Sequence, residues 1–161
     1  MSPSVRTDVV DAYVYRHDEH RRSGRAVEVL QLHRVEAPLR ATWQPVMGHV
    51  EAGESAVDTM WRELREEVGL ERAAALDAYA LEQVHPFFIA ELDAVFLSPR
   101  FAVEVASSFE PVLNAEHDAA RWVPLDRAVD EFLWPGQRAA LRELTALLDG
   151  DPAAAVLRLA R

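Results

Sequence analysis

The sequence predicts an α/β fold of three layers, with a mixed β-sheet between helices. Segments rich in β-branched and aromatic residues recur along the chain and favour strands. A well-delimited helix is expected at residues 55–68, and helical patterns return after residue 126. The 161 residues contain no internal repeat and no low-complexity linker, so we expect one domain over residues 1–161.

Three strands are expected before the central helix. Residues 9–15 and 26–33 have the composition of strands, and the charged segment between them contains Gly24. This arrangement predicts a hairpin with a long polar loop. Residues 43–47 predict a short third strand that leads directly to Gly48.

The central helix is predicted by the residues at its two ends. Ser55 and Asp58 have the spacing of an N-terminal capping box, and Gly69 is a natural C-terminal stop. One face of this helix is expected to pack on the sheet through an apolar stripe of Val57, Met60, Leu64 and Val68.

Three further strands are predicted after the central helix. Residues 76–84, 88–97 and 101–105 have strand composition, and Pro99 and Arg100 predict a turn between the last two. These strands are expected to complete the sheet.

The C-terminal part of the chain predicts one more strand and then helices. Residues 119–123 form the strand, and Asp126 is expected to be the N-cap of a helix that ends at Phe132. Leucines recur at helical spacing over residues 137–148, so a second helix is expected there. Both helices should cover the sheet, while residues 150–161 predict a short helix or a tail.

Three glutamates share one face of the central helix. At about 100° per residue, Glu63, Glu66 and Glu67 fall within an arc of roughly 100° beside the apolar stripe. Like charges three and four residues apart repel one another, so this cluster does not stabilise the helix. A hard divalent cation, Mg²⁺ or Mn²⁺, would neutralise it, because such ions prefer carboxylate oxygens. The alternative is a solvated helix face without function.

The segment from Gly48 to Leu70, which we call the box, reads GHVEAGESAVDTMWRELREEVGL. Its glycines, its arginine and its glutamates have the spacing of the signature of the Nudix hydrolases, so the chain resembles that family. The resemblance implies an α/β/α sandwich with a mixed sheet. It also implies metal-dependent hydrolysis of a phosphoanhydride bond in a nucleotide-like diphosphate compound, and it favours the metal site over the solvated face.

The resemblance implies roles for individual residues. Glu63, Glu66 and Glu67 would bind the metal, together with the carbonyl oxygen of Gly48. Glu116 precedes a predicted strand, as a similar glutamate does in members that hydrolyse triphosphates, and would be the fourth carboxylate. Either Glu63 or Glu116 would take the proton from the attacking water, and the sequence leaves that choice open.

Other residues are expected to support these ligands. Arg62 would assist catalysis by forming an ion pair with Glu54, which orients the carboxylates and ties the loop before the helix to the helix. Gly53 would let that loop turn where a side chain would collide. His117 is expected either to approach the site or to brace the loop that carries Glu116.

The residues before the box indicate a branch of the family. Trp43 and Gln44, ahead of Gly48, resemble the segment of members that hydrolyse nucleoside triphosphates or dihydroneopterin triphosphate to a monophosphate and pyrophosphate. Trp43 is expected either to stack on a base or pterin ring or to fill the core. Arg34 and Arg40 are the candidates for phosphate contact. ADP-ribose and dinucleoside polyphosphates stay open as substrates, as does a module that senses a nucleotide without cleaving it.

Composition disfavours several other classes of function. The formal net charge of −10 and the pI near 5.0 disfavour nucleic acid and anionic membranes as partners. All 17 basic residues are arginines, so guanidinium groups are left to bind phosphate. The absence of cysteine excludes disulfides and thiolate chemistry, and with it the cysteine-dependent isomerases of the family.

The chain also lacks the features of a membrane or secreted protein. No apolar run approaches the length of about 18 residues that a spanning helix needs, and the first residues do not have the pattern of a signal peptide. We therefore expect a cytoplasmic protein that acts on a small molecule, with a homodimer as one possible assembly.

Overall fold

The computed structural model describes residues 2–18, 26–37 and 39–160, so residues 19–25 of the polar loop predicted at residues 16–25 lie outside the described residues, while residues 16–18 continue the preceding strand. An eight-stranded sheet forms the middle layer. Its strands are β1 (Ser4–Arg6), β2 (Val9–Asp18), β3 (Ala26–Arg34), β4 (Trp43–Gln44), β5 (Val46–His49), β6 (Asp77–Ile89), β7 (Ala94–Val105) and β8 (His117–Pro124). The α-helices are α1 (Ala56–Val68), α2 (Leu125–Glu131), α3 (Pro135–Leu148) and α4 (Ala154–Leu157).

The sheet is mixed, as predicted, and is centred on β2. This strand pairs antiparallel with β3 and β5 and parallel with β7. Strand β7 pairs antiparallel with β6 on its other edge and parallel with the short β1 on the same edge as β2. Strand β3 pairs antiparallel with β8 on its other edge and with β4 on the same edge as β2.

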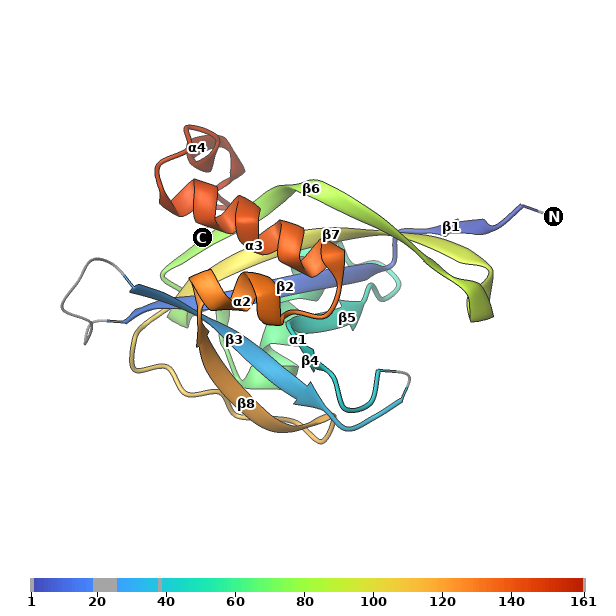
Figure 1. Ribbon diagram of the computed structural model, residues 1–161, viewed down its shortest axis with the longest axis horizontal. Helices are drawn as coiled ribbons and strands as arrows, with labels where there is room; N and C mark the ends of the chain where they lie inside the picture. The colour runs from blue at the N-terminus through green and yellow to red at the C-terminus, as the bar shows by residue number, and fades with distance from the viewer. Residues whose placement is uncertain (1, 19–25, 38, 161) are drawn as a thin grey trace.

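Helices cover both faces of the sheet, which confirms the predicted α/β/α sandwich (Figure 1). Side chains alternate along a strand, so β2 sends Val10, Ala12 and Val14 to one face and Tyr13 and Tyr15 to the other. The first three pack in one core with residues of α1, and the two tyrosines pack in a second core with residues of α2 and α3. Of the α-helices that the structure describes, α1 alone supplies residues to the core on its face of the sheet.

Helix α1 begins and ends where its sequence predicts. The hydroxyl of Ser55 accepts a hydrogen bond from the backbone N–H of Asp58, and the Asp58 carboxylate accepts one from the N–H of Ser55, each at 3.2 Å. Gly69 ends the helix with φ 70°, a left-handed conformation that favours glycine. These caps hold the glutamate-bearing face of α1 in a defined register.

The prediction for β6 and β7 is wrong at their turn. The chain reverses at Ala90–Leu92, and β7 runs without interruption through Pro99. A proline is tolerated there because β7 changes neighbours at this point: Ala94–Phe96 pair with β1, and pairing with β2 starts only at Arg100. On the other side, the register with β6 shifts between Leu81 and His85, opposite the same proline.

Prolines also explain smaller differences. Pro45 divides the expected strand at 43–47 into β4, which pairs with β3, and β5, which pairs with β2. Pro135 and Gly136 begin α3 rather than interrupt the chain, since proline suits the first helical position. Asp126 is not an N-cap, because β8 runs directly into α2 and Pro124 takes the cap position. Within the described ranges, no helix is long and apolar enough to cross a membrane.

Candidate metal centre and active site

The contact between β5 and α1 brings Gly48 against Glu63. A β-carbon added at Gly48 would lie 2.0 Å from the carboxyl carbon and from Oε1 of Glu63, so a larger residue at this position would displace the Glu63 side chain. The Glu63 side chain is 12% exposed. The pKa of Glu63 is raised above its ordinary value because burial outweighs the opposing effect of the hydrogen bond from Arg62. Gly48 and Glu63, the residues that carry two of the predicted ligands, are therefore adjacent.

Glu67 is the most enclosed carboxylate of the box, with 1% of its surface exposed. A backbone hydrogen bond from Met47 favours its ionised form, but Oε2 is buried and has no hydrogen-bond partner among the described residues. Burial, followed by repulsion from Glu63 and Glu116, raises the pKa of Glu67 to about 9. An unpaired buried carboxylate is unfavourable unless a cation joins it.

Arg62 connects the box loop to the carboxylates of α1. Its Nε and Nη2 donate to the two oxygens of Glu54 at 2.8 and 3.0 Å, and Nη2 also donates to the carbonyl of His49 at 2.8 Å. Its Nη1 donates to Glu63 at 2.7 Å and to Glu66 at 3.3 Å. The hydrogen bonds from Arg62 lower the pKa of Glu54 to about 2. This bidentate pair is the geometry expected of a group that orients its neighbours.

Glu116 reaches the same region from the segment before β8. Its Oε2 accepts from Nη1 of Arg34 at 2.8 Å, and its backbone carbonyl accepts from the N–H of Val35 at 2.9 Å. Glu116 raises the pKa of both Glu63 and Glu67 through repulsion. The structure thus brings Glu116 close to the carboxylates of the box. It also pairs Glu116 with Arg34, which lies 82 residues earlier in the chain.

The carboxylates have the chemistry of a hard-cation site, but they are turned toward arginines. Among the described residues, no three His, Asp or Glu side chains form a ready-made metal-binding group. Glu63, Glu66 and Glu116 instead accept from Arg62 or Arg34. The unpaired Oε2 of Glu67 and the close approach of Glu63 to Gly48 fit a divalent cation, whose binding would require the other carboxylates to exchange their arginine partners.

Comparison with known proteins agrees with this geometry. A family model described as the NUDIX domain matches residues 6–144. The chain belongs to the Nudix family. As a Nudix hydrolase it acts on acid anhydrides. It is 32% identical over 117 residues to the asymmetrical bis(5'-nucleosyl)-tetraphosphatase of Rattus norvegicus, a match that covers 69% of this chain and 75% of that protein.

Another curated relative is much longer than this Nudix chain. The octanoyltransferase of Myxococcus xanthus is 36% identical over 109 residues, which cover 65% of this chain but 29% of that protein. The chain therefore spans less than a third of its length. The match concerns the shared segment, and the octanoyltransferase activity is not transferred.

Solved structures share the Nudix fold at lower identity. The Ap4A hydrolase of C. elegans has a TM-score of 0.75 and 19% identity, covering 91% of this chain and all 100% of that one. The dihydroneopterin triphosphate pyrophosphohydrolase of E. coli has a TM-score of 0.68 and 22% identity, covering 89% and 96%. At these identities the likeness concerns the fold.

Two residues predicted to bind substrate make other contacts in the structure. Trp43 lies beside His33, on the sheet face opposite that of Leu32 and α1, and its ring is covered by Arg121 at 4.2 Å. Arg40 donates from its Nε to the carbonyl of Val35 at 2.8 Å.

Gly53, in the box loop, has φ 87° and no atom within 4 Å of an added β-carbon. Glycine is therefore favoured there by the backbone conformation and not, as predicted, by crowding.

The structure adds the partners of His117 beneath Glu67, whose contacts sequence reasoning missed. His117 is buried, with its Nε2 3.3 Å from the Gln44 amide nitrogen and 3.9 Å from Oε2 of Glu67. Asn114 faces the other ring nitrogen of His117 at 3.2 Å. Asn114 could have been found as the start of a tight turn before Glu116, but no local pattern places Gln44 beside His117.

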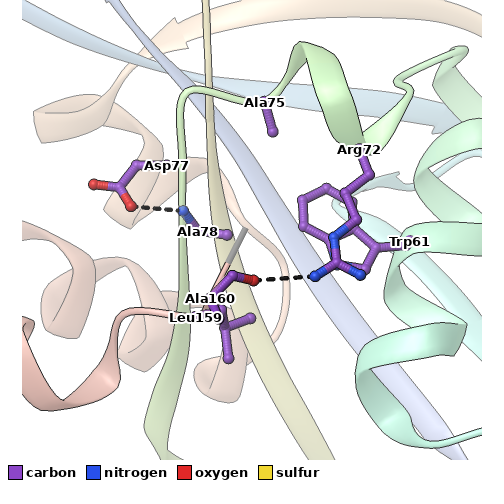
Figure 2. A pocket seen from close by; sticks show the side chains of 7 residues that line it. All are labelled: Trp61, Arg72, Ala75, Asp77, Ala78, Leu159 and Ala160. Atoms are coloured by element: carbon purple, nitrogen blue, oxygen red, sulfur yellow. Dashed lines mark hydrogen bonds between the residues drawn. The ribbon is translucent and has the colours of Figure 1, made fainter.

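A shallow hollow lies elsewhere along α1 and contains none of the box carboxylates (Figure 2). Trp61 and Arg72 form one wall, where the Arg72 guanidinium lies 5.5 Å from the centre of the Trp61 ring. Arg72 also donates to the carbonyl of Ala160 at 3.0 Å, which closes the hollow with the C-terminal segment. Trp61 is partly buried here against the core.

Proposed function

We propose that this Nudix hydrolase uses a divalent cation, Mg²⁺ or Mn²⁺, to hydrolyse a phosphoanhydride bond of a nucleoside polyphosphate. The observation that carries the proposal is Glu67, a buried carboxylate with an unpaired oxygen beside two further carboxylates. Such a group is stabilised when a cation binds. A purely structural cluster would not gather like charges at this depth.

We assign separate roles in this reaction to the residues of the site. Glu63, Glu66, Glu67 and Glu116, with the Gly48 carbonyl, would hold the cation, which when bound neutralises phosphate oxygens and lowers the pKa of water. Glu63 and Glu116 are both candidates for the general base, since each is a carboxylate close enough to Glu67 to repel it. Arg62, held by Glu54, would keep Glu63 and Glu66 in place.

The arginine beside Glu116 is our candidate for phosphate contact. Arg34 has an ion pair with Glu116 at 2.8 Å, and a polyphosphate bound there would compete for the same guanidinium. Exchange of Arg34 from Glu116 to phosphate would free the carboxylate at the moment when substrate binds. Trp43 and Arg40 stay sequence predictions for substrate binding, because each is engaged by other groups in the structure.

Dinucleoside tetraphosphates are the substrate class that we propose first. Three relatives of 31–36% identity are named as asymmetrical bis(5'-nucleosyl)-tetraphosphatases. Asymmetrical cleavage of such a compound yields a nucleoside triphosphate and a monophosphate. An acidic protein can bind such an anion through a bridging cation and arginines.

Nucleoside or dihydroneopterin triphosphates are the second candidate. The run from Trp43 to Gly48 resembles that branch, and the fold is shared with the dihydroneopterin triphosphate enzyme of E. coli. Hydrolysis of such a substrate would yield a monophosphate and pyrophosphate.

Phosphorus NMR of the products separates these substrates. The protein is incubated with Mg²⁺ or Mn²⁺ and, in separate samples, diadenosine tetraphosphate, a set of nucleoside triphosphates, dihydroneopterin triphosphate and ADP-ribose. We expect ATP and AMP from the first at the highest rate. Pyrophosphate as the preferred product would select the triphosphate class instead. Binding of nucleotides with Mg²⁺ but no phosphorus product from any sample would overturn the proposed metal-dependent hydrolysis of nucleoside polyphosphates.

A further inference from the structure

The segment before β8 forms a tight turn that fixes the identity of the Asn114 oxygen. The backbone N–H of Glu116 donates to Asn114 Oδ1 at 3.1 Å, and the N–H of His117 donates to the Asn114 carbonyl at 3.4 Å. An atom that accepts from a backbone N–H must be the amide oxygen and not the amide nitrogen. The Asn114 side chain is therefore oriented without ambiguity by the turn itself.

This oxygen faces one nitrogen of the His117 ring. Nδ1 lies 3.2 Å from Asn114 Oδ1, so the hydrogen bond between them requires a proton on Nδ1. The opposite nitrogen, Nε2, lies 3.3 Å from the amide nitrogen of Gln44, which is a donor. One ring nitrogen thus faces an acceptor and the other faces a donor, which is the pattern of a neutral imidazole with its proton on Nδ1.

The position of that proton matters for Glu67. Nε2 also faces Oε2 of Glu67 at 3.9 Å, and this oxygen has no hydrogen-bond partner among the described residues. A proton on Nε2 would be drawn to that carboxylate oxygen and would compete with a cation for it. With the proton on Nδ1, the Nε2 atom of His117 offers a lone pair to the amide of Gln44. Oε2 of Glu67 then receives no hydrogen bond from the imidazole.

We propose that His117 is a positioning residue whose tautomer, set by Asn114, keeps the imidazole N–H away from Oε2 of Glu67 and leaves that oxygen without a competing donor when a cation binds. This inference rests on the proposed metal-dependent function. The same turn carries Glu116, so Asn114 bears on two of the four proposed carboxylate ligands: it accepts from the backbone N–H of Glu116, and it orients the His117 ring that faces Glu67. The unpaired oxygen of Glu67 is then a feature that the surrounding residues maintain.

The tautomer can be observed in the metal-free protein. Long-range proton–nitrogen correlation spectra of ¹⁵N-labelled protein report which ring nitrogen carries the proton, and the His117→Gln variant identifies the signal by its loss. We expect the Nδ1–H form for His117. A proton on Nε2, or on both nitrogens, would overturn the inference whatever the enzyme hydrolyses.

Variants of Asn114 test whether this residue sets the tautomer. Asn114→Ala removes the acceptor, so the proton should move to Nε2, and calorimetric affinity for Mg²⁺ should fall about 10-fold or more, as for other groups that orient metal ligands. Asn114→Asp keeps an acceptor oxygen and should retain the Nδ1–H signal. His17→Gln, which changes a histidine of β2 that contacts Glu104, is the matched control and should alter neither quantity.

Each outcome has a distinct meaning. An unchanged tautomer in Asn114→Ala, or a changed tautomer with unaltered Mg²⁺ affinity, would contradict the role given to Asn114 and His117. If the unaltered protein binds no Mg²⁺, the proposed metal-dependent function is wrong. The tautomer of His117 then has no role in cation binding. The NMR signal of the metal-free protein would still decide, by itself, whether Asn114 sets the tautomer.

Discussion

The carboxylate of Glu63 occupies the space that a β-carbon at position 48 would need, at a separation of 2.0 Å. Helix α1 and strand β5 are in contact at this point, so neither can move away without opening the core. We predict that Gly48→Ala displaces the Glu63 side chain and lowers hydrolysis by about 10-fold to 100-fold, as for disturbed metal ligands. Steady-state turnover with saturating Mg²⁺ measures the loss.

Gly150→Ala is the matched control for this substitution. Gly150 has φ 100°, so alanine is strained there, but nothing lies within 4 Å of its added β-carbon. We expect a loss of about 1 kcal/mol in the free energy of unfolding without a change in turnover. Equal activity losses in the two variants would show that the Glu63 contact is not the reason for glycine at position 48.

Glu67→Gln should inactivate the enzyme and stabilise the metal-free protein. Glutamine keeps the shape of the side chain but cannot neutralise a cation, so we expect turnover to fall by about three decades or more, equivalent to about 4 kcal/mol of barrier. The same change removes a buried carboxylate that is unfavourable when ionised. Turnover and thermal unfolding in the absence of metal test both halves.

The sign of the stability change follows from the pKa of Glu67. Burial raises it from the ordinary 4.5 to about 9, so between these values the folded protein binds more protons than the unfolded chain. The free energy of unfolding of the metal-free protein therefore falls as pH rises from about 4.5 to about 9. At pH 8 we expect Glu67→Gln to be more stable than the unaltered protein, by on the order of a few kcal/mol.

The exposed Glu82 supplies a control for this prediction. Glu82→Gln, in β6, also removes one negative charge and should change neither turnover nor the pH dependence of stability. If Glu67→Gln lowers the melting temperature at pH 8 in the absence of metal, Glu67 is stabilised in its ionised form by the protein alone, and the case for a cation weakens.

Affinity for Mg²⁺ should increase with pH up to about 9. Because burial and the neighbouring carboxylates raise the pKa of Glu67 to about 9, the metal-free protein carries a proton there at neutral pH. A cation must displace that proton, so the association constant should rise by up to about tenfold per pH unit. Calorimetry in buffers of different ionisation enthalpy would detect the released proton. Affinity that is constant from pH 6 to 9 would exclude proton displacement at Glu67.

Arg62→Lys tests the ion pair with Glu54. Lysine keeps the charge but cannot donate two parallel hydrogen bonds to Glu54 while it also reaches Glu63. We predict a loss of about 10-fold to 100-fold in Mg²⁺ affinity with little change in secondary structure by circular dichroism.

Arg65→Lys is the matched control on the same helix. The Arg65 side chain is 54% exposed and approaches only Glu66 among the ion pairs of the described residues, at 3.9 Å. An exposed pair of this kind contributes about 0–1 kcal/mol, so affinity for Mg²⁺ should stay within about twofold. A comparable loss in both variants would mean that total charge, and not the bidentate geometry, explains the role of Arg62.

Local sequence was sufficient where a residue acts on its own neighbours along the chain. The capping box at Ser55, the stop at Gly69 and the shared face of Glu63, Glu66 and Glu67 all follow from helical spacing, and the structure has the helix as predicted. Prolines were harder to interpret. Pro99 lies within β7 because the neighbouring strand changes there. Which strands pair on either side of a proline cannot be predicted from the residues next to it.

The sequence by itself determined that one capped helix presents three glutamates beside an apolar stripe, because helical geometry depends only on residues a few positions apart. Only the tertiary structure decided that Glu67 is buried without a partner, that Arg34 holds Glu116, and that Gln44 and His117 meet beneath the box. Burial and pairing depend on strands that are distant in the chain. The pKa of Glu67 and the tautomer inferred for His117 are consequences of that packing.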